Sequence, residues 1–319
     1  MMRTLALALV LLAPAVALAD IIPTLPSTLA IEVAPSAPTP GERVTLSTQS
    51  FSGNQAEIVY TWRVNGAVVD QGVGVTSITI TAGAVGSATE VTISANENGV
   101  PRGSASVTLR PARVDLVWEG HTSVPPLLGI LPLTTGESPV TILAVPTLYA
   151  QGAAVAANNL MYVWRINNNQ APIKSGVGVS SIVVTPPSFA SAFGVSVTAS
   201  TRDGGTVASN RIVIEPTQSH ILVYENAPLL GIRLDRAITG QFPLLGDEAT
   251  FSMYPVYVER AGNLGYRWTV NGAEATSTSP REITFRKTGA GQGHYTIGAS
   301  YTSASKLFER ATSSFLLTF

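Results

Sequence analysis

One nine-residue segment occurs three times along this chain, and its copies are one compact domain apart. The copies are IVYTWRVNG at 58–66, LMYVWRINN at 160–168 and LGYRWTVNG at 264–272. Their tryptophans, Trp62, Trp164 and Trp268, follow one another at intervals of about 100 residues, which is the usual size of one domain and is longer than a solenoid or propeller repeat. The repeat therefore predicts three similar domains in a row.

Each copy has the alternation of a strand that buries one face. Ile58, Tyr60, Trp62 and Val64 fall on the same side of an extended chain, with the period of two that a half-buried strand has. Asn-Gly ends the first and third copies, and this pair supplies the positive φ angles of a tight hairpin turn. The predicted core aromatic residues, at equivalent places in the three copies, are Tyr60, Trp62, Tyr162, Trp164, Tyr266 and Trp268.

Other short alternating segments flank each copy and are separated by Gly, Pro, Asn and Ser, with almost no helical period. Many short strands without helices indicate an all-β chain of three tandem antiparallel β-sandwiches. Prolines at 111 and 216 interrupt the pattern and mark the boundaries. The predicted units are 41–111, 112–216 and 217–319, after a proline-rich lead-in at 20–40 with a possible edge strand at 29–33.

The motif Tyr-x-Trp-x-Val/Ile-Asn-Gly in a repeat of this length resembles strand C of bacterial immunoglobulin-like and polycystic-kidney-disease (PKD) type domains. In that fold a buried tryptophan packs between two sheets. The resemblance therefore implies that Trp62 packs on Leu46 and Ile93, Trp164 on Ile142 and Val197, and Trp268 on Phe251 and Ile297. The chain lacks the disulfide of antibody domains and the Gly-Asp-Gly that commonly follows the tryptophan in PKD repeats. The resemblance implies a fold and carries no activity with it.

Residues 1–19 have the features of a secretory signal peptide. Arg3 precedes an apolar run at 5–16, and Ala17-Leu18-Ala19 forms a small-residue cleavage site before Asp20. We therefore expect export to the periplasm, the cell surface or the extracellular space. The apolar run is short for a permanent membrane span, and no later stretch is long enough, so we predict no span in the mature chain.

Composition limits the classes of partner. Charged residues make up 12% of the 319 residues and the net charge is −1, so the basic surface that nucleic-acid binding needs is absent. There is no cysteine, so each unit must depend on its own apolar core rather than on disulfides. A surface this poor in charge suggests packing between domains or against another protein.

A second repeat lies near the predicted junctions. LVWE at 116–119 precedes PLLGI at 126–130, and LVYE at 222–225 precedes PLLGI at 228–232, with no counterpart before the first unit. One hypothesis is that the leucines of PLLGI pack on the preceding domain and stiffen the joint. They could instead belong to the core of their own domain or form an exposed patch for a partner. The residues concerned are Leu127, Leu128, Leu229 and Leu230, with Trp118 and Tyr224 expected to flank the joints.

The sequence has no recognisable arrangement for catalysis. His121, His220 and His294 are far apart and lack metal-ligand spacing. No serine lies in Gly-x-Ser-x-Gly, and the acidic residues do not form a calcium-binding loop. We therefore predict no catalytic residue, no metal site and no cofactor, and the chain is not expected to be an enzyme.

These features predict a non-enzymatic exported protein that acts as a structural or adhesive spacer and recognition module in the bacterial envelope. Its partner would be another envelope protein or a copy of itself, bound at loops or at sheet edges where an incoming strand completes the ladder. One alternative is an accessory component of a pilus or secretion assembly. A second alternative is a carbohydrate-binding accessory module, for which Trp118 and Tyr224 would be the aromatic residues to contact a glycan.

Overall fold

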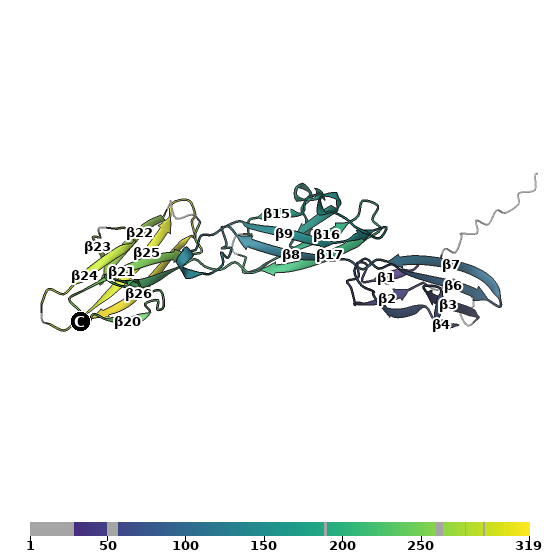
Figure 1. Ribbon diagram of the computed structural model, residues 1–319, viewed down its shortest axis with the longest axis horizontal. Coiled ribbons are helices and arrows are strands. Elements are labelled where there is room, and N and C mark those ends of the chain that lie inside the picture. The colour runs from purple at the N-terminus through teal and green to yellow at the C-terminus, as the bar shows by residue number, and fades with distance from the viewer. Residues whose placement is uncertain (1–28, 50–56, 188–189, 260–263, 278, 290) are drawn as a thin grey trace, which may run out of the picture.

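The computed structural model describes residues 29–49, 57–187, 190–259, 264–277, 279–289 and 291–319. In this part of the chain the strands form three pairs of facing sheets, arranged one after another along a shallow arch (Figure 1). The prediction of three tandem antiparallel β-sandwiches is therefore confirmed. The predicted signal peptide and the lead-in up to residue 28 lie outside the described residues. None of the described helices is long and apolar enough to cross a membrane.

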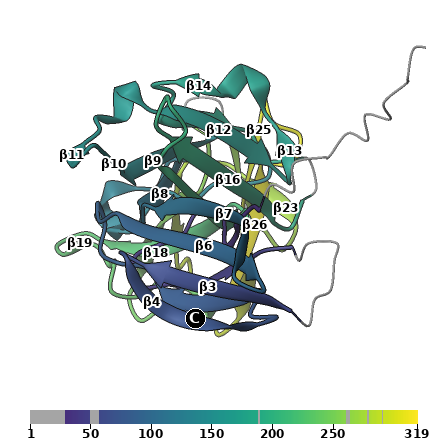
Figure 2. The same cartoon turned by 90° about the vertical axis from the view of Figure 1, so that its right-hand side faces the viewer.

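The first sandwich faces the viewer in Figure 2, which looks along the row. Its smaller sheet has the order β1 (Glu32–Ala34), β2 (Arg43–Ser47), β5 (Ser77–Thr81), and its larger sheet has the order β4 (Ala67–Val73), β3 (Ile58–Val64), β6 (Thr89–Glu97), β7 (Val100–Leu109). The edge strand predicted at 29–33 is present but begins later, at Glu32. Leu29 is instead buried in the core of this domain.

The second sandwich repeats this plan. One sheet has the order β15 (Ser181–Val184), β9 (Val140–Thr147), β8 (Arg113–Gly120), and the other has the order β13 (Asn169–Gln170), β12 (Met161–Ile166), β16 (Phe193–Ser200), β17 (Val207–Ile214), with β14 (Gly176–Val177) also on β12. Its loops contain the hairpin β10 (Tyr149–Ala150) and β11 (Ala153–Ala154), and the 3-10 turns η1 (Pro126–Leu128), η2 (Ala157–Asn159) and η3 (Pro172–Lys174).

The third sandwich has one sheet in the order β19 (Gly231–Ile232), β18 (His220–Ala227), β21 (Glu248–Val256), β24 (Glu282–Arg286). Its other sheet has the order β20 (Gly240–Pro243), β26 (Arg310–Thr318), β25 (His294–Ser303), β22 (Leu264–Val270), β23 (Ala273–Ala275). β20 pairs in parallel with β26, and the other pairs are antiparallel.

Three separate hydrophobic cores lie between the paired sheets, one for each repeat of the tryptophan strand. They draw on residues 29–109, 112–214 and 221–317 respectively. Trp62 and Trp164 are 0% exposed and Trp268 is 2% exposed. Tyr60 and Tyr162 are buried beside them, whereas Tyr266 is only half-buried.

The buried indoles of the first two domains also satisfy their polar atom. Trp62 Nε1–H donates to the Val75 carbonyl at 2.8 Å, and Trp164 Nε1–H donates to the Val179 carbonyl at 2.9 Å. A buried indole N–H without an acceptor would lower stability, so these bonds fix the ring as well as accommodate it. The two tryptophans are therefore held by packing and by a hydrogen bond.

The partner strand in the third domain is displaced relative to the sequence alignment. Trp268 lies opposite Ala299, two residues away from the Ile297 that the sequence alignment places there, and Ile297 belongs to the same core. The displacement places Tyr301, 1% exposed, in the core. At one level of the core, the third domain therefore has an aromatic ring where the first two domains have a small side chain.

Candidate functional site

The first joint leaves almost no free chain between two domains. Only residues 110–112 separate β7 from β8. Ala112 is 0% exposed and belongs to the core of the second domain, yet its N–H donates to the Pro38 carbonyl of the first domain at 3.3 Å. The linker is therefore bound to both of its neighbours.

A loop of the first domain also receives a side chain from the second. Gly86 has φ +80°, and its N–H donates to the Pro111 carbonyl at 3.3 Å. A Cβ atom at this position would lie 2.9 Å from Cγ of Tyr149. Glycine thus lets the Tyr149 ring of the second domain lie directly on the backbone of the first.

The second joint is formed mainly by the loop at 121–139 between β8 and β9, which we call the joint loop. Ser123 of this loop exchanges two backbone hydrogen bonds with Val258 of the third domain, at 2.6 and 3.3 Å. Thr134 accepts a third backbone bond, at 2.9 Å, from Thr217 in the linker. The joint loop thus holds both the linker and the next domain.

Buried hydroxyl groups stabilise the joint loop from inside. Thr134 Oγ1 donates to the Ser138 carbonyl at 2.7 Å, and Thr135 Oγ1 donates to Ser138 Oγ at 2.8 Å. All three residues are at most 8% exposed. Buried, paired hydroxyls of this kind fix a loop conformation because an unpaired one is costly. These hydrogen bonds lie within the joint loop and involve no residue of the third domain.

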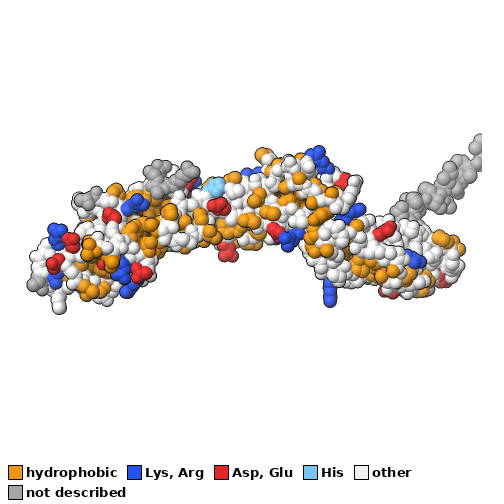
Figure 3. All heavy atoms as spheres, in the orientation of Figure 1, with side chains coloured by type: hydrophobic (Ala, Val, Ile, Leu, Met, Phe, Trp, Pro, Cys, Tyr) orange, Lys and Arg blue, Asp and Glu red, His pale blue; other side chains and the backbone are white. Residues whose placement is uncertain are grey.

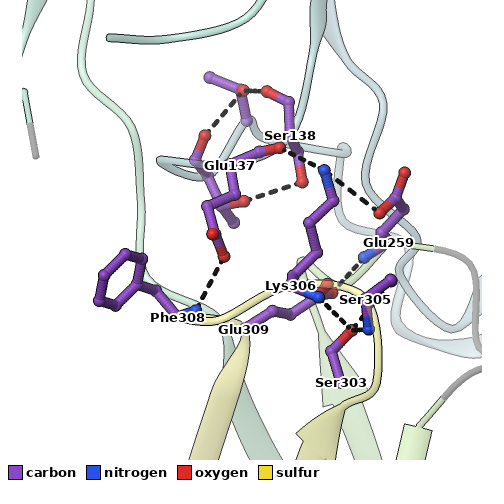
Figure 4. A network of polar contacts seen from close by, with 10 residues as sticks. Glu137, Ser138, Glu259, Ser303, Ser305, Lys306, Phe308 and Glu309 are labelled. Carbon is purple, nitrogen blue, oxygen red and sulfur yellow. Dashed lines mark hydrogen bonds and ion pairs between the residues drawn. The ribbon is translucent and has the colours of Figure 1, made fainter. Parts of the chain in front are cut away.

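A polar network that includes Glu137 of the joint loop joins the two domains (Figure 4). Lys306 Nζ donates to the Glu137 carbonyl at 3.0 Å and lies 3.5 Å from the Glu259 carboxylate. The N–H of Phe308 donates to Glu137 Oε2 at 2.9 Å. Glu137, from the second domain, is thus contacted through its main chain and its side chain by the segment between β25 and β26. A cavity of about 630 Å³ lies next to this network and is lined in part by Glu137, Phe308 and Glu309.

Glu309 is the most constrained carboxylate of this network. It is 5% exposed, and its Oε1 accepts from the N–H of Glu259, while Oε2 has no hydrogen-bond partner among the described residues. Burial raises the pKa of the Glu309 carboxyl. The hydrogen bond from Glu259 and the positive charge of Lys306 oppose this rise, and the carboxylates of Glu259 and Glu137 add to it.

We expect Glu309→Gln to stabilise the third domain at neutral pH. The folded chain holds the Glu309 proton more tightly than the unfolded chain, so this residue's contribution to stability falls as pH rises from the ordinary carboxyl range through the raised pKa. Glutamine has no such proton and still accepts from Glu259. In thermal unfolding, the Tm of the variant should therefore exceed that of the wild type at pH 7, and this difference should shrink as the pH falls towards about 4. Glu274→Gln, at an exposed position, is the control, and identical pH profiles for the two variants would contradict the expectation.

The leucines of the second repeat do not pack on the preceding domain, so that hypothesis is wrong. Leu127 is 54% exposed, Leu229 98% and Leu230 74%, and Leu128 is half-buried. The reason is the direction of the chain, because β8 and β18 each start at a joint and run away from it. The loop that follows therefore lies at the far end of its own domain. These leucines are not core residues either, and their use by a partner stays a prediction.

The two aromatic residues of that repeat also differ in their surroundings. Trp118 is half-buried, lies opposite Ile142 and packs on the second core. Tyr224 lies opposite Ser252, away from the third core, and is 5% exposed with its ring at 5.9 Å from that of Tyr254. Neither is an exposed aromatic platform. No group of three or more His, Cys, Asp or Glu residues suited to a metal occurs in the described ranges.

The fold and the joints define a tandem array of immunoglobulin-like β-sandwiches. No known protein family and no curated protein matches the sequence. Among solved structures, the chain is similar to the three N-terminal domains of the bacteriophage RB49 Highly Immunogenic Outer Capsid protein, with 13% identity over 91% of this chain and 98% of that one, at a TM-score of 0.25. It is also similar to the central fibronectin-III array of RIM-binding protein, with 12% identity over 91% and 95%, at 0.30. A third similarity is to fibronectin(III)-like modules of Clostridium thermocellum CbhA, with 11% identity over 59% and 95%, at 0.29. At such scores these similarities add nothing to what the sheets themselves define.

Proposed function

We propose that this chain is a non-enzymatic, exported spacer and recognition module of the bacterial envelope. The observation that carries the proposal is the second joint, where the joint loop bonds to Val258 and the segment of Lys306 and Phe308 bonds to Glu137, so that main-chain and side-chain contacts hold two sandwiches together. A chain that only needed separate binding domains could use a free linker. Contacts of this kind instead keep the domain ends at a set separation, which is what a spacer requires.

The apolar loops at the far end of the third domain favour the second candidate, an accessory component of a pilus or secretion assembly. Leu229, Leu230 and Leu245 are between 74% and 98% exposed there. Exposed apolar side chains clustered at one end are typical of a contact with another protein. The carbohydrate-binding alternative has no such support, because the aromatic residues that suggested it are buried or half-buried.

Fractionation of the source cells tests the export on which both candidates depend. We expect the protein in the envelope or the medium, with a mature N-terminus at Asp20 as measured by mass spectrometry. In intact cells, a cross-linker should then join it to an envelope component or to itself. A cytoplasmic protein that retains Met1 would contradict the proposal.

A further inference from the structure

The outer face of one sheet in the second domain is aliphatic. On β8, β9 and β15 the side chains of Val117, Leu143, Val145 and Val183 are between 43% and 57% exposed. Val117 and Leu143 are direct cross-strand neighbours. Figure 3 keeps the orientation of Figure 1, in which this sheet is turned toward the viewer, and shows apolar side chains gathered over the middle of the row. We call these four residues the aliphatic face.

The other two domains of the same chain show that the sandwich does not need an aliphatic face. At the place of the Thr141–Val183 pair, the first domain has Thr45–Thr79 and the third has Thr250–Thr284, and in both the hydroxyls are in contact. At the place of Leu143 the other domains have Ser47 and Ser252. Since the two strands compared pair in the same register in all three domains, the second domain departs from a polar pattern that its neighbours keep.

The charges around the aliphatic face are distributed unequally between its two edges. Glu119 on β8, Thr141 on β9 and Val183 on β15 form one row across the sheet. At the β15 end of this row, Lys174 Nζ donates to the Val183 carbonyl at 2.6 Å. One row therefore has a carboxylate at one edge and an ammonium at the other.

We propose that the aliphatic face binds the same face of a second copy of this chain, so that two rods lie side by side and point in the same direction. A two-fold axis parallel to β9 places the β8 edge of each copy over the β15 edge of the other. In this arrangement Glu119 of each copy lies next to Lys174 of the other, so two equivalent ion pairs form. Leu143 and Val145, on the central strand, each contact the equivalent residue of the second copy. An axis perpendicular to the strands would instead bring Glu119 toward Asp115 of the second copy, a carboxylate that already has Arg113 as its ion-pair partner, so Glu119 would gain no cation there.

The area available sets the strength of this dimer. Three short strands offer less than the roughly 800 Å² that each partner contributes to a standard interface. We therefore expect a dissociation constant in the micromolar range or weaker, with each domain as stable in the monomer as in the dimer. The dimer goes beyond the proposed spacer role, because a monomeric rod is sufficient to keep its two ends apart. A monomeric but exported rod would thus refute the dimer and leave the proposed function intact.

The absence of cysteine makes the test direct. Leu143→Cys in the full mature chain should be joined into a covalent dimer by a short bismaleimide, since the axis passes close to this position and stacked sheets lie about 10 Å apart. Ser47→Cys, the matched position of the first domain, is the control. Equal yields from the two variants, or no dimer from Leu143→Cys at high protein concentration, would overturn the proposal.

Charge exchange tests the direction of the two rods. In sedimentation equilibrium, Glu119→Lys and Lys174→Glu should each weaken the dimer about tenfold, because each change affects two symmetric ion pairs. The double variant should restore the wild-type dissociation constant. If Lys174→Glu weakened the dimer only by removing the Lys174–Val183 hydrogen bond, adding Glu119→Lys would not restore it. Single variants without effect, or a double variant that stays monomeric, would refute the parallel arrangement.

Discussion

Trp164→Ala is expected to unfold the second domain and to leave the other two folded. The side chain is 0% exposed, and its removal deletes both the largest buried group of that core and the hydrogen bond to Val179. Truncations of this kind cost about 3–5 kcal/mol, which is a large part of the stability of a domain of this size. Hydrogen exchange measured by mass spectrometry should lose protection in 112–214 and keep it in 221–317.

Trp118→Ala is the matched control, since this indole is only half-buried at the margin of the same core. It should cost about 1–2 kcal/mol, in line with the smaller apolar area that it buries. The assignment of separate cores would be contradicted if Trp164→Ala removed protection from all three domains together, or if the two tryptophan variants were equally destabilised.

Lys306→Glu is expected to open the second joint. The change replaces the ammonium that contacts the Glu137 carbonyl and the Glu259 carboxylate by another carboxylate, next to Glu309. Breaking a well-buried ion pair costs about 3–5 kcal/mol, and because the Lys306 side chain is 26% exposed we expect about 2–3 kcal/mol here. Small-angle X-ray scattering should show a wider distribution of end-to-end distances, while the core of each domain stays folded.

Arg267→Glu provides a control of the same charge change in the same domain. Its ion pair with Glu274 is long, at 3.6 Å, and both side chains are more than half exposed, so little stability depends on it. The scattering of this variant should match that of the wild type. Unchanged scattering for Lys306→Glu as well would show that the backbone contacts of Ser123 and Val258 hold the joint without the charges.

The cores could be predicted from the sequence because they follow from local patterns. The alternation around Trp62 and Trp164 identifies both the strand and its buried face, and each faces the predicted residue, Ile93 or Val197, on the partner strand. Trp268 faces Ala299 instead of Ile297, because hairpin register depends on the strand ends and on loop lengths, and short alternating segments with a period of two fit equally well two residues apart.

The joints could not be predicted in the same way. The sequence similarity of LVWE and LVYE suggests equivalent surroundings for their aromatic residues, and the structure does not show this. Trp118 and Tyr224 occupy the same place in the repeat, but β8 and β18 pair with their neighbours one residue out of step, so the two rings face opposite sides of their sheets. Glu137 and Lys306 are 169 residues apart and carry no motif. In the sequence, Glu137 and Lys306 are distinguished only by carrying a charge in a chain where few residues are charged.

The position of Ala112 has a consequence for a chain under tension. A pull on the two ends of the molecule passes from β7 to β8 through three residues, one of which lies inside the second core while its N–H is bonded to the first domain. No slack is available to lengthen before the force reaches a folded unit. Extension at this point must therefore begin with the rupture of domain contacts, and the first joint transmits load instead of absorbing it.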